Sequence, residues 1–302
     1  MLMTKHKILV SPTTFIAEPL SLLSDYEVVR NPFGRVMTSS EVIELGGDCI
    51  GIIAGIEILD STVLNSISLL RCISRCGVGI DNIDLVRAKE LGIVVVNTPD
   101  APTQAVAEFT IGLILTGLRH IVEDNAAVHN GQWKQPVGKL LGRQTLGIIG
   151  CGRIGSAVAE LVKPFGTKLI GCDPVVNRHP TIQLVSLGEL LLDADIVSLH
   201  LPYTESVHHL VDSQFISRMK RETLLINTSR GGIVDEEALY EAIVSGYLVG
   251  ACIDVFEEMP YKGSLVRLDN VILTSHIGAY TKETKLEQQT QAVKNLLEVL
   301  NG

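Results

Sequence analysis

The sequence predicts an α/β protein built from two doubly wound domains, each with a parallel sheet. Short apolar runs alternate with helical patterns along most of the chain, and two prolines interrupt this alternation between residues 97 and 102. The 302 residues are 46% hydrophobic and 20% charged, which is enough to build two domains with substantial cores. We therefore expect two domains that meet at the proline-rich segment.

The first hundred residues predict one of these domains. Helical patterns occur between the apolar runs, for example at residues 61–67 and 85–91. No glycine-rich nucleotide-binding turn is found here, which indicates an open α/β domain with another purpose. The two prolines in residues 97–102 make a stiff linker, and we place a domain boundary there. The predicted strands cover residues 7–10, 27–30, 49–53, 71–74 and 93–97.

The second domain is predicted to follow this linker. Residues 103–122 form a long apolar pattern, which predicts a single helix buried either in the core of its own subunit or in a subunit interface. From residue 144 to about 280, strands and helices alternate strictly, as in a complete doubly wound fold. The six predicted strands cover residues 147–149, 168–172, 196–199, 223–227, 250–254 and 271–273.

The last stretch of the chain, residues 281–300, predicts an amphipathic helix. We expect this helix to pack back on residues 1–98, which makes the first domain discontinuous. The predicted domains are therefore 1–98 together with 281–302, and 99–280.

The most informative motif is the sequence GCGRIG at residues 150–155, which follows an apolar run and opens a helical pattern. Gly150 permits a tight turn, Gly152 lets backbone N–H groups approach a pyrophosphate, and Gly155 lets helix and strand pack closely. A second apolar run then leads to Asp173, which would accept hydrogen bonds from the adenosine ribose and repel a 2′-phosphate. The motif therefore predicts a dinucleotide site that favours NAD over NADP.

Two polar residues at strand ends indicate chemistry on a small acid. Arg230 follows a buried strand and precedes two glycines, where its guanidinium can hold a carboxylate and an adjacent keto oxygen. His276 follows the last predicted strand, where an imidazole can donate the proton that completes a carbonyl reduction. The alternatives are an arginine bonded to local carbonyls and a structural histidine. The dinucleotide motif in the same domain favours the chemical roles.

The first domain carries one candidate anion site, the sequence GVGIDNID at residues 77–84. Its glycines leave the successive backbone N–H groups of Val78 and Gly79 exposed, which forms a nest suited to a carboxylate. The alternative is a turn between strand and helix that Asp81 or Asn82 caps. The two roles are compatible.

These motifs are shared with a known family. They include the 77–84 loop, Asn97-Thr98-Pro99, the glycine motif, the Arg230 segment, Asp254-Val255-Phe256 and His276-Ile277-Gly278. The chain resembles the D-isomer-specific 2-hydroxyacid dehydrogenases nearly end to end, most closely their phosphoglycerate dehydrogenase branch. The resemblance implies two Rossmann-like domains, with the NAD-binding domain inserted into a discontinuous flavodoxin-like substrate domain. It also implies a homodimer formed through the NAD-binding domain.

The resemblance further implies roles for single residues. Arg230 matches the arginine that binds the substrate, His276 matches the acid/base, and Asp254 matches an aspartate near the nicotinamide carboxamide. Arg75 resembles a basic residue near the substrate, beside the proposed nest. No residue is implied as a metal ligand. The residues implied as further cofactor contacts are Gly150, Gly152, Arg153, Ile154, Gly155, Asp173, Leu201, Pro202, Thr228, Ser229 and Gly278.

One departure from the family pattern affects the predicted chemistry. The family places a glutamate directly before Pro260, where it hydrogen-bonds the catalytic histidine, but this chain has Met259 there. A carboxylate would fix the histidine tautomer and keep the imidazole a usable proton donor, which a thioether does poorly. Glu258 is a doubtful substitute because neighbours in an extended segment point opposite ways. We expect a catalyst weakened by about 10²-fold.

The sequence thus predicts hydride transfer between NAD and C2 of a small anionic D-2-hydroxyacid or 2-keto acid. The first candidate pair is 3-phosphoglycerate and 3-phosphohydroxypyruvate, which would place the chain in serine biosynthesis. Reduction of hydroxypyruvate or glyoxylate is the second candidate. The alternative from another class is a non-catalytic NAD-binding sensor or scaffold, which Met259 supports and which the retention of Arg230 and His276 opposes.

Charge and composition bear on partners and location. The formal net charge of −9 argues against binding to nucleic acid or to anionic membranes, so an anionic substrate needs local basic residues. Six cysteines lack metal-ligand spacing, and the first residues lack the apolar core of a signal peptide. We therefore expect a cytoplasmic protein.

Overall fold

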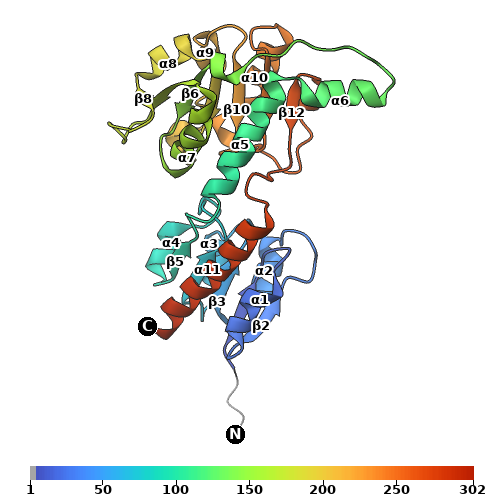
Figure 1. The fold of residues 1–302 in the computed structure, drawn as a ribbon. Coiled ribbons are helices and arrows are strands. Elements are labelled where there is room, and N and C mark those ends of the chain that lie inside the picture. The colour runs from blue at the N-terminus through green and yellow to red at the C-terminus, as the bar shows by residue number, and fades with distance from the viewer. Residues whose placement is uncertain (1–4) are drawn as a thin grey trace. The chain divides into compact units, whose positions relative to one another are not determined.

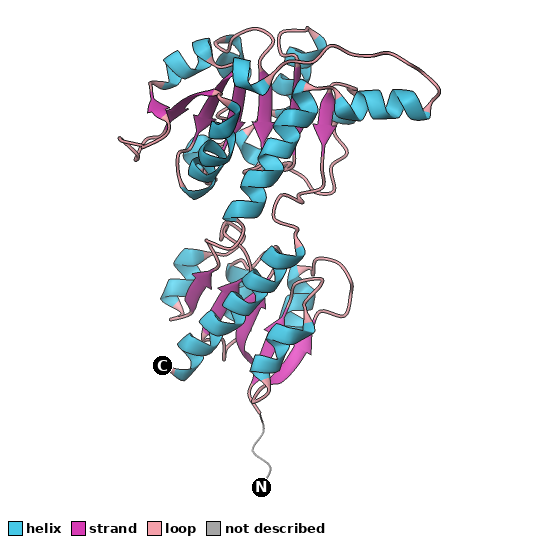
Figure 2. Cartoon of the chain, viewed as in Figure 1, coloured by secondary structure: helices cyan, strands magenta, loops and turns pink. Residues whose placement is uncertain are grey.

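The computed structural model describes residues 5–302, which divide into two compact units (Figure 1). The first unit comprises the chain up to Pro102 together with Tyr280–Gly302, and the second unit comprises Thr103–Ala279. Each unit contains its own parallel sheet, which Figure 2 shows as two separate sets of strands. The predicted α/β class with two doubly wound sheets is confirmed.

In the first unit the strand order is β2-β1-β3-β4-β5, and every neighbouring pair is parallel. This order is flavodoxin-like, as the resemblance implied. The middle strand is buried along its whole length because its sequence, CIGIIA, is continuously apolar or small. The elements before Pro102 are β1 (Lys7–Val10), α1 (Ala17–Leu20), β2 (Glu27–Arg30), α2 (Ser39–Gly46), β3 (Cys49–Ala54), α3 (Ser61–Ser66), β4 (Cys72–Arg75), α4 (Leu85–Glu90) and β5 (Val94–Asn97).

The C-terminal helix α11 (Lys282–Asn301) packs on this first sheet, as Figure 1 shows. Its buried apolar residues, Ala292, Val293, Leu296 and Leu300, lie on one face of the helix. Leu296 and Leu300 share a core cluster with Ile8 of β1, and the Ser74 hydroxyl of β4 donates to the Ala292 carbonyl at 2.7 Å. The last helix therefore belongs to the same core as the first five strands.

In the second unit seven parallel strands have the order β12-β11-β10-β9-β6-β7-β8. Counted from β6, this is the Rossmann order 3-2-1-4-5-6 with a seventh strand added. The sequence predicted six strands and missed β8, because two residues are too short to show a pattern. The strands are β6 (Thr145–Ile149), β7 (Lys168–Cys172), β8 (Gln183–Leu184), β9 (Ile196–Leu199), β10 (Leu224–Asn227), β11 (Gly250–Ile253) and β12 (Val271–Leu273).

Most helices begin at a side chain that caps the first turn. Thr38 before α2 and Ser186 before α8 each form a capping box with a glutamate three positions later. Asp212 and Asp235 cap α9 and α10. α7 starts without such a cap, which matters for the site described below. The helices of the second unit are α5 (Thr103–Leu118), α6 (Ile121–His129), α7 (Arg153–Val162), α8 (Leu187–Asp193), α9 (Ser213–Ser217) and α10 (Glu236–Val244).

The single helix predicted at residues 103–122 is wrong. α5 ends at Leu118, His120 adopts a left-handed conformation with φ of 54°, and α6 continues at an angle of 62°. α5 is a core helix of the second unit, because Leu113 and Ile114 share a buried cluster with Val158 of α7. Among residues 5–302 no single helix is long and apolar enough to cross a membrane, and only the bent pair α5–α6 meets that criterion together.

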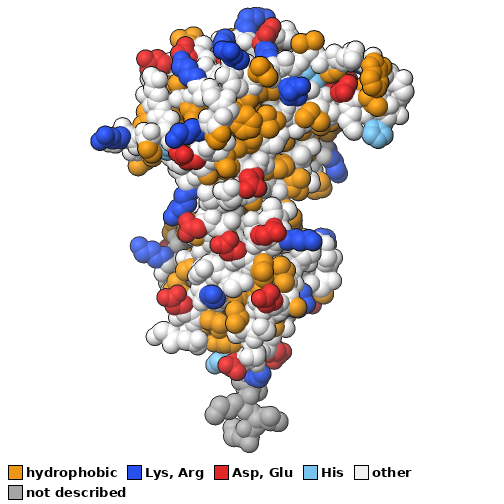
Figure 3. All heavy atoms as spheres, viewed as in Figure 1, with side chains coloured by type: hydrophobic (Ala, Val, Ile, Leu, Met, Phe, Trp, Pro, Cys, Tyr) orange, Lys and Arg blue, Asp and Glu red, His pale blue; other side chains and the backbone are white. Residues whose placement is uncertain are grey.

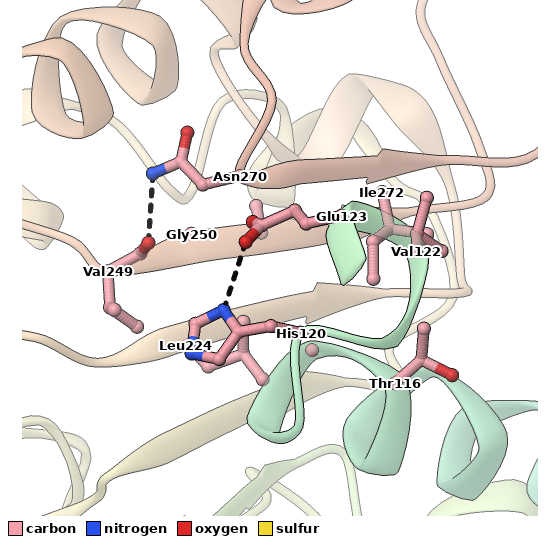
Figure 4. A pocket seen from close by; sticks show the side chains of 11 residues that line it. Thr116, His120, Val122, Glu123, Leu224, Val249, Gly250, Asn270 and Ile272 are labelled. Atoms are coloured by element: carbon pink, nitrogen blue, oxygen red, sulfur yellow. Dashed lines mark hydrogen bonds and ion pairs between the residues drawn. The ribbon is translucent and has the colours of Figure 1, made fainter. Parts of the chain in front are cut away.

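A small cavity of about 30 Å³ lies beside this bend (Figure 4). The His120 ring pairs with Glu123 of α6 at 3.2 Å, and Figure 4 shows both side chains at the cavity. Leu224 and Gly250, the first residues of β10 and β11, line its other side. The cavity is therefore at the amino ends of the strands, whereas ligands of such sheets bind at the carboxyl ends.

A largely buried histidine makes the stability of the second unit depend on pH. His200 follows β9, its Nε2 lies 2.8 Å from the Ser198 hydroxyl, and burial lowers its pKa from 6.5 to about 4. Between these values the unfolded chain binds a proton that the folded chain does not. The free energy of unfolding should therefore fall as the pH decreases from about 6.5 to 4, by at most about 3 kcal/mol from this group.

His200→Gln should lose this part of the pH dependence, since the amide keeps a partner for Ser198 but does not titrate. Urea denaturation of both proteins at pH 7 and pH 5 measures the difference. An equal loss of stability in the variant and the unchanged protein would show that His200 is not responsible.

Candidate functional site

The glycine motif occupies the point where the strand order of the second unit reverses, between β6 and β9. Ligands of open α/β sheets bind at such a point. Gly150 has φ of 94°, and a Cβ on it would lie 2.6 Å from the His200 carbonyl oxygen. A Cβ on Gly155 would lie 2.1 Å from the Gly150 carbonyl oxygen. Only glycine fits at both positions, so the close packing of β6, β9 and α7 depends on them.

The start of α7 is open toward this turn. Its N-cap residue is Gly152, which offers no side chain, and no atom lies within 4 Å of the position a Cβ would take. The first N–H groups of a helix need acceptors, so an uncapped start with open space in front of it suits a phosphate. Arg153 and Ile154, two predicted cofactor contacts, are the first two residues of this helix.

Asp173 lies at the end of β7, beside the glycine turn. Its Oδ2 accepts from the Cys151 N–H at 2.7 Å, and its Oδ1 accepts from the Val175 and Val176 N–H groups at 2.8 Å. Burial favours a higher pKa for this carboxyl, but the three N–H groups outweigh it and lower the pKa below 3.8. The ionised carboxylate keeps acceptor capacity for ribose hydroxyls. Glycine turn, open helix start and carboxylate together fit NAD.

Arg230 lies in a turn after β10 that Asn227 organises. The fully buried Asn227 accepts from the N–H and hydroxyl of Ser229 at 3.1 and 2.8 Å, and its Nδ2 donates to the Arg230 carbonyl at 2.9 Å. A Cβ on Gly231 would lie 1.9 Å from the Phe256 carbonyl carbon, so the turn packs tightly on the segment after β11. Asn227 is absent from the sequence-based predictions, although a buried polar residue at a strand end was a signal for it.

The other predicted cofactor contacts also follow strands of this sheet. Leu201 and Pro202 come after β9, and Thr228 comes after β10. The buried Thr228 hydroxyl lies 3.1 Å from that of Thr110, which ties the core helix α5 to this edge. Within residues 5–302 no three His, Cys, Asp or Glu side chains gather as a metal site.

His276 lies in a turn after β12 that the side chain of Asp254 stabilises through hydrogen bonds. Asp254 is 1% exposed; its Oδ1 accepts from the Thr274 hydroxyl at 2.6 Å and the Ile277 N–H at 2.9 Å, and its Oδ2 accepts from the Gly278 N–H at 2.9 Å. The His276 N–H donates to the Asp254 carbonyl at 2.9 Å, and His276 has φ of 56°. Asp254 thus positions the turn that carries His276. Its contact with the nicotinamide carboxamide stays a prediction.

Met259 stands in the segment after β11, at the position where the family pattern has a glutamate. Its side chain is 51% exposed. The nearby Glu257 forms an ion pair with Nε2 of His209, and its N–H donates to Glu236 at 3.0 Å. Burial is the main cause that raises the pKa of Glu236. The carboxylate of Glu257 is thus paired with His209.

In the first unit the predicted nest follows β4. Gly77 has φ of 149° and donates to the Thr98 hydroxyl at 2.8 Å. Asn97 Nδ2 donates to the Val78 carbonyl at 2.6 Å, which turns that carbonyl toward β5. Among residues 5–302 the N–H groups of Val78 and Gly79 find no acceptor. This geometry suits an anion.

The Arg75 side chain folds back onto its own turn. Its guanidinium lies over Gly77 and donates to the Cys76 carbonyl.

The cap of the following helix, α4, differs from the prediction. The predicted caps Asp81 and Asn82 are wrong, because Asp84 accepts from the Arg87 N–H at 2.8 Å and caps α4. Asn82 instead donates to the carbonyl of the buried Glu57 at 2.6 Å, which ties the loop to the turn after β3.

Comparison with known proteins agrees with this geometry. Residues 111–278 match the family described as D-isomer specific 2-hydroxyacid dehydrogenase, NAD binding domain. The chain belongs to the D-isomer specific 2-hydroxyacid dehydrogenase family. The match includes the glycine turn, Arg230 and His276, so the second unit is the NAD-binding domain of an NAD-dependent 2-hydroxyacid dehydrogenase. The family and cofactor that the sequence motifs implied are confirmed.

Relatives carry several substrate names. The chain is 42% identical to D-3-phosphoglycerate dehydrogenase of Methanocaldococcus jannaschii, over 80% of this chain and 47% of that protein. It is also 42% identical to hydroxypyruvate reductase of Thermotoga maritima, over 76% of this chain and 78% of that protein. D-lactate dehydrogenase of Aquifex aeolicus, solved with NAD and lactic acid, superposes with a TM-score of 0.89 at 31% identity, covering 98% and 96% of the two chains. The chain thus spans about half of the phosphoglycerate dehydrogenase relative.

Proposed function

We propose that the chain catalyses hydride transfer between NAD and C2 of a small D-2-hydroxyacid or 2-keto acid. The observation that carries the proposal is where Arg230 and His276 lie. Arg230 lies in a turn after β10 that the buried Asn227 anchors, and His276 lies in a turn after β12 that the buried Asp254 anchors. Both turns stand at the carboxyl edge of the sheet that holds the glycine motif. A guanidinium and an imidazole at a dinucleotide site provide an anion clamp and a proton donor.

The proposed roles follow from the chemistry of each group. Bound NADH supplies the hydride for C2 of a 2-keto acid. Arg230 holds the carboxylate and the keto oxygen, which aligns C2 and stabilises charge that develops on that oxygen. His276 donates a proton to the same oxygen, which completes the 2-hydroxyacid, and takes the proton back in the reverse direction. In the first unit, the N–H groups of Val78 and Gly79 are proposed to bind an anion, with Arg75 in the same turn.

Two substrate classes remain in the proposal. 3-Phosphoglycerate is the first, as in the relatives named phosphoglycerate dehydrogenase. Hydroxypyruvate or glyoxylate is the second, as in the relatives named hydroxypyruvate reductase and glyoxylate reductase. A place in serine biosynthesis and a cytoplasmic location stay predictions.

NADH oxidation with 3-phosphohydroxypyruvate, hydroxypyruvate, glyoxylate and pyruvate should show saturable turnover with at least one of them. Arg230→Lys and His276→Gln should each lower kcat/KM by about 10²-fold or more while NADH binding persists, since they remove the clamp and the proton donor. Absorbance assays and NADH fluorescence titrations measure the two effects separately. NADH binding without turnover on any of the four acids would favour the sensor alternative.

Met259→Glu should raise kcat by up to about 10²-fold and shift the pH profile, because a carboxylate beside the histidine restores its orientation and proton affinity. Glu258→Gln, in the same exposed segment, serves as the matched control and should leave kcat unchanged. Steady-state rates across a pH series provide the test. Equal rates for Met259→Glu and the unchanged chain would mean that position 259 does not act on His276.

We also propose a homodimer formed through the NAD-binding domain. Hydrophobic side chains are exposed along α6, as Figure 3 shows, and on the loop that follows it. Single exposed apolar residues are ordinary, but several on one helix and the loop after it make this segment a candidate interaction site. The exposed fractions are 51% for Ile121, 50% for Val122, 46% for Val128, 79% for Trp133, 92% for Val137 and 67% for Leu140.

Sedimentation velocity should therefore show a dimer, which the double variant Ile121→Glu/Val128→Glu converts to monomers by burying charge without a partner. Leu192→Glu, at a leucine on α8 that is 68% exposed, is the control and should leave the dimer intact. A monomeric unchanged chain would contradict the proposal.

A further inference from the structure

Segment 174–182 joins Asp173 to β8, and it is anchored at both ends. At its start, Asp173 Oδ1 accepts from the N–H groups of Val175 and Val176 at 2.8 Å. At its far end, Nδ1 of His179 accepts from the N–H groups of Thr181 and Ile182 at 3.2 and 3.1 Å. The segment therefore folds around one carboxylate and one imidazole.

These contacts assign the hydrogen-bonding roles of the two ring nitrogens of His179. Nδ1 accepts two N–H bonds, which leaves Nε2 as the donor of the ring. Nε2 lies 3.0 Å from the hydroxyl of Ser156 in α7 and donates to it. The Ser156 hydroxyl in turn donates to the Cys151 carbonyl at 3.1 Å.

The chain of hydrogen bonds closes at the cofactor site. The Cys151 carbonyl belongs to the glycine turn, and the Cys151 N–H donates to Asp173 Oδ2 at 2.7 Å. A second tie joins the same elements, because the Thr181 hydroxyl donates to Glu160 of α7. Ile182 is 3% exposed and lies in the core cluster with Val158, so the end of the segment is fixed by packing as well.

We propose that His179 is a positioning residue for NAD binding. Its imidazole holds segment 174–182 against α7 and thereby keeps the Asp173 carboxylate in place for the adenosine ribose. The inference rests on the NAD site of the proposed function, but it concerns binding and not turnover. Removal of the Nδ1 acceptor would leave the N–H groups of Thr181 and Ile182 without this partner, so NADH affinity should fall when that acceptor is removed.

The test is the Kd of NADH, measured by fluorescence with the whole chain at pH 8. Asparagine places an acceptor where Nδ1 lies, whereas glutamine places its amide near Nε2 and provides no acceptor for Thr181 and Ile182. At pH 8 His179→Ala and His179→Gln should raise Kd about tenfold, and His179→Asn should stay within about threefold of the unchanged chain. His129→Gln, an exposed histidine on α6, is the control and should leave Kd unchanged.

Equal Kd for His179→Ala and the unchanged chain, or a Kd for His179→Asn as high as that for His179→Ala, would overturn the proposal. A KM for the keto acid that rises in step with Kd in His179→Ala would also overturn it, since that indicates general damage. Absence of NADH binding by the unchanged chain would refute the proposed function itself.

Discussion

The site depends on the contact between the backbone of the glycine turn and the carbonyl oxygens around it. A Cβ on Gly150 would lie 2.6 Å from the His200 carbonyl oxygen, and one on Gly155 would lie 2.1 Å from that of Gly150. Because neither residue has a side chain, β6, β9 and α7 meet at the switch point of the sheet. The open start of α7 then faces the place where a pyrophosphate binds.

Buried polar side chains hold the functional groups around this turn. Asp254 accepts from three donors and shapes the turn of His276. Asn227 shapes the turn of Arg230, because it accepts from the Ser229 hydroxyl and donates to the Arg230 carbonyl. Each is at most 1% exposed, so the loss of one partner would leave a buried polar group unsatisfied. This cost makes the turns rigid, and rigid turns present the guanidinium and the imidazole at defined positions.

The sequence predicted the strands of both sheets within one or two residues, apart from β8, because short apolar runs bounded by turn residues are typical of buried strands. It failed where a local pattern leaves several outcomes open. The apolar pattern at residues 103–122 continues across His120, yet the chain turns there into its left-handed conformation. Asp84, not Asp81 or Asn82, caps α4, since three neighbouring polar residues offer equivalent caps by sequence.

By itself the sequence determined the fold class, the family and its NAD cofactor, because these depend on residue types at fixed spacings. It also predicted the roles of Arg230 and His276 and revealed the unusual Met259. Only the tertiary structure decided how these groups are supported. Asp254 holds the His276 turn through donors 20 to 24 positions away, and Ser156 links to His179 across 23 positions. Such partners have no local signature, since folding brings them together and hydrogen-bond geometry selects among them.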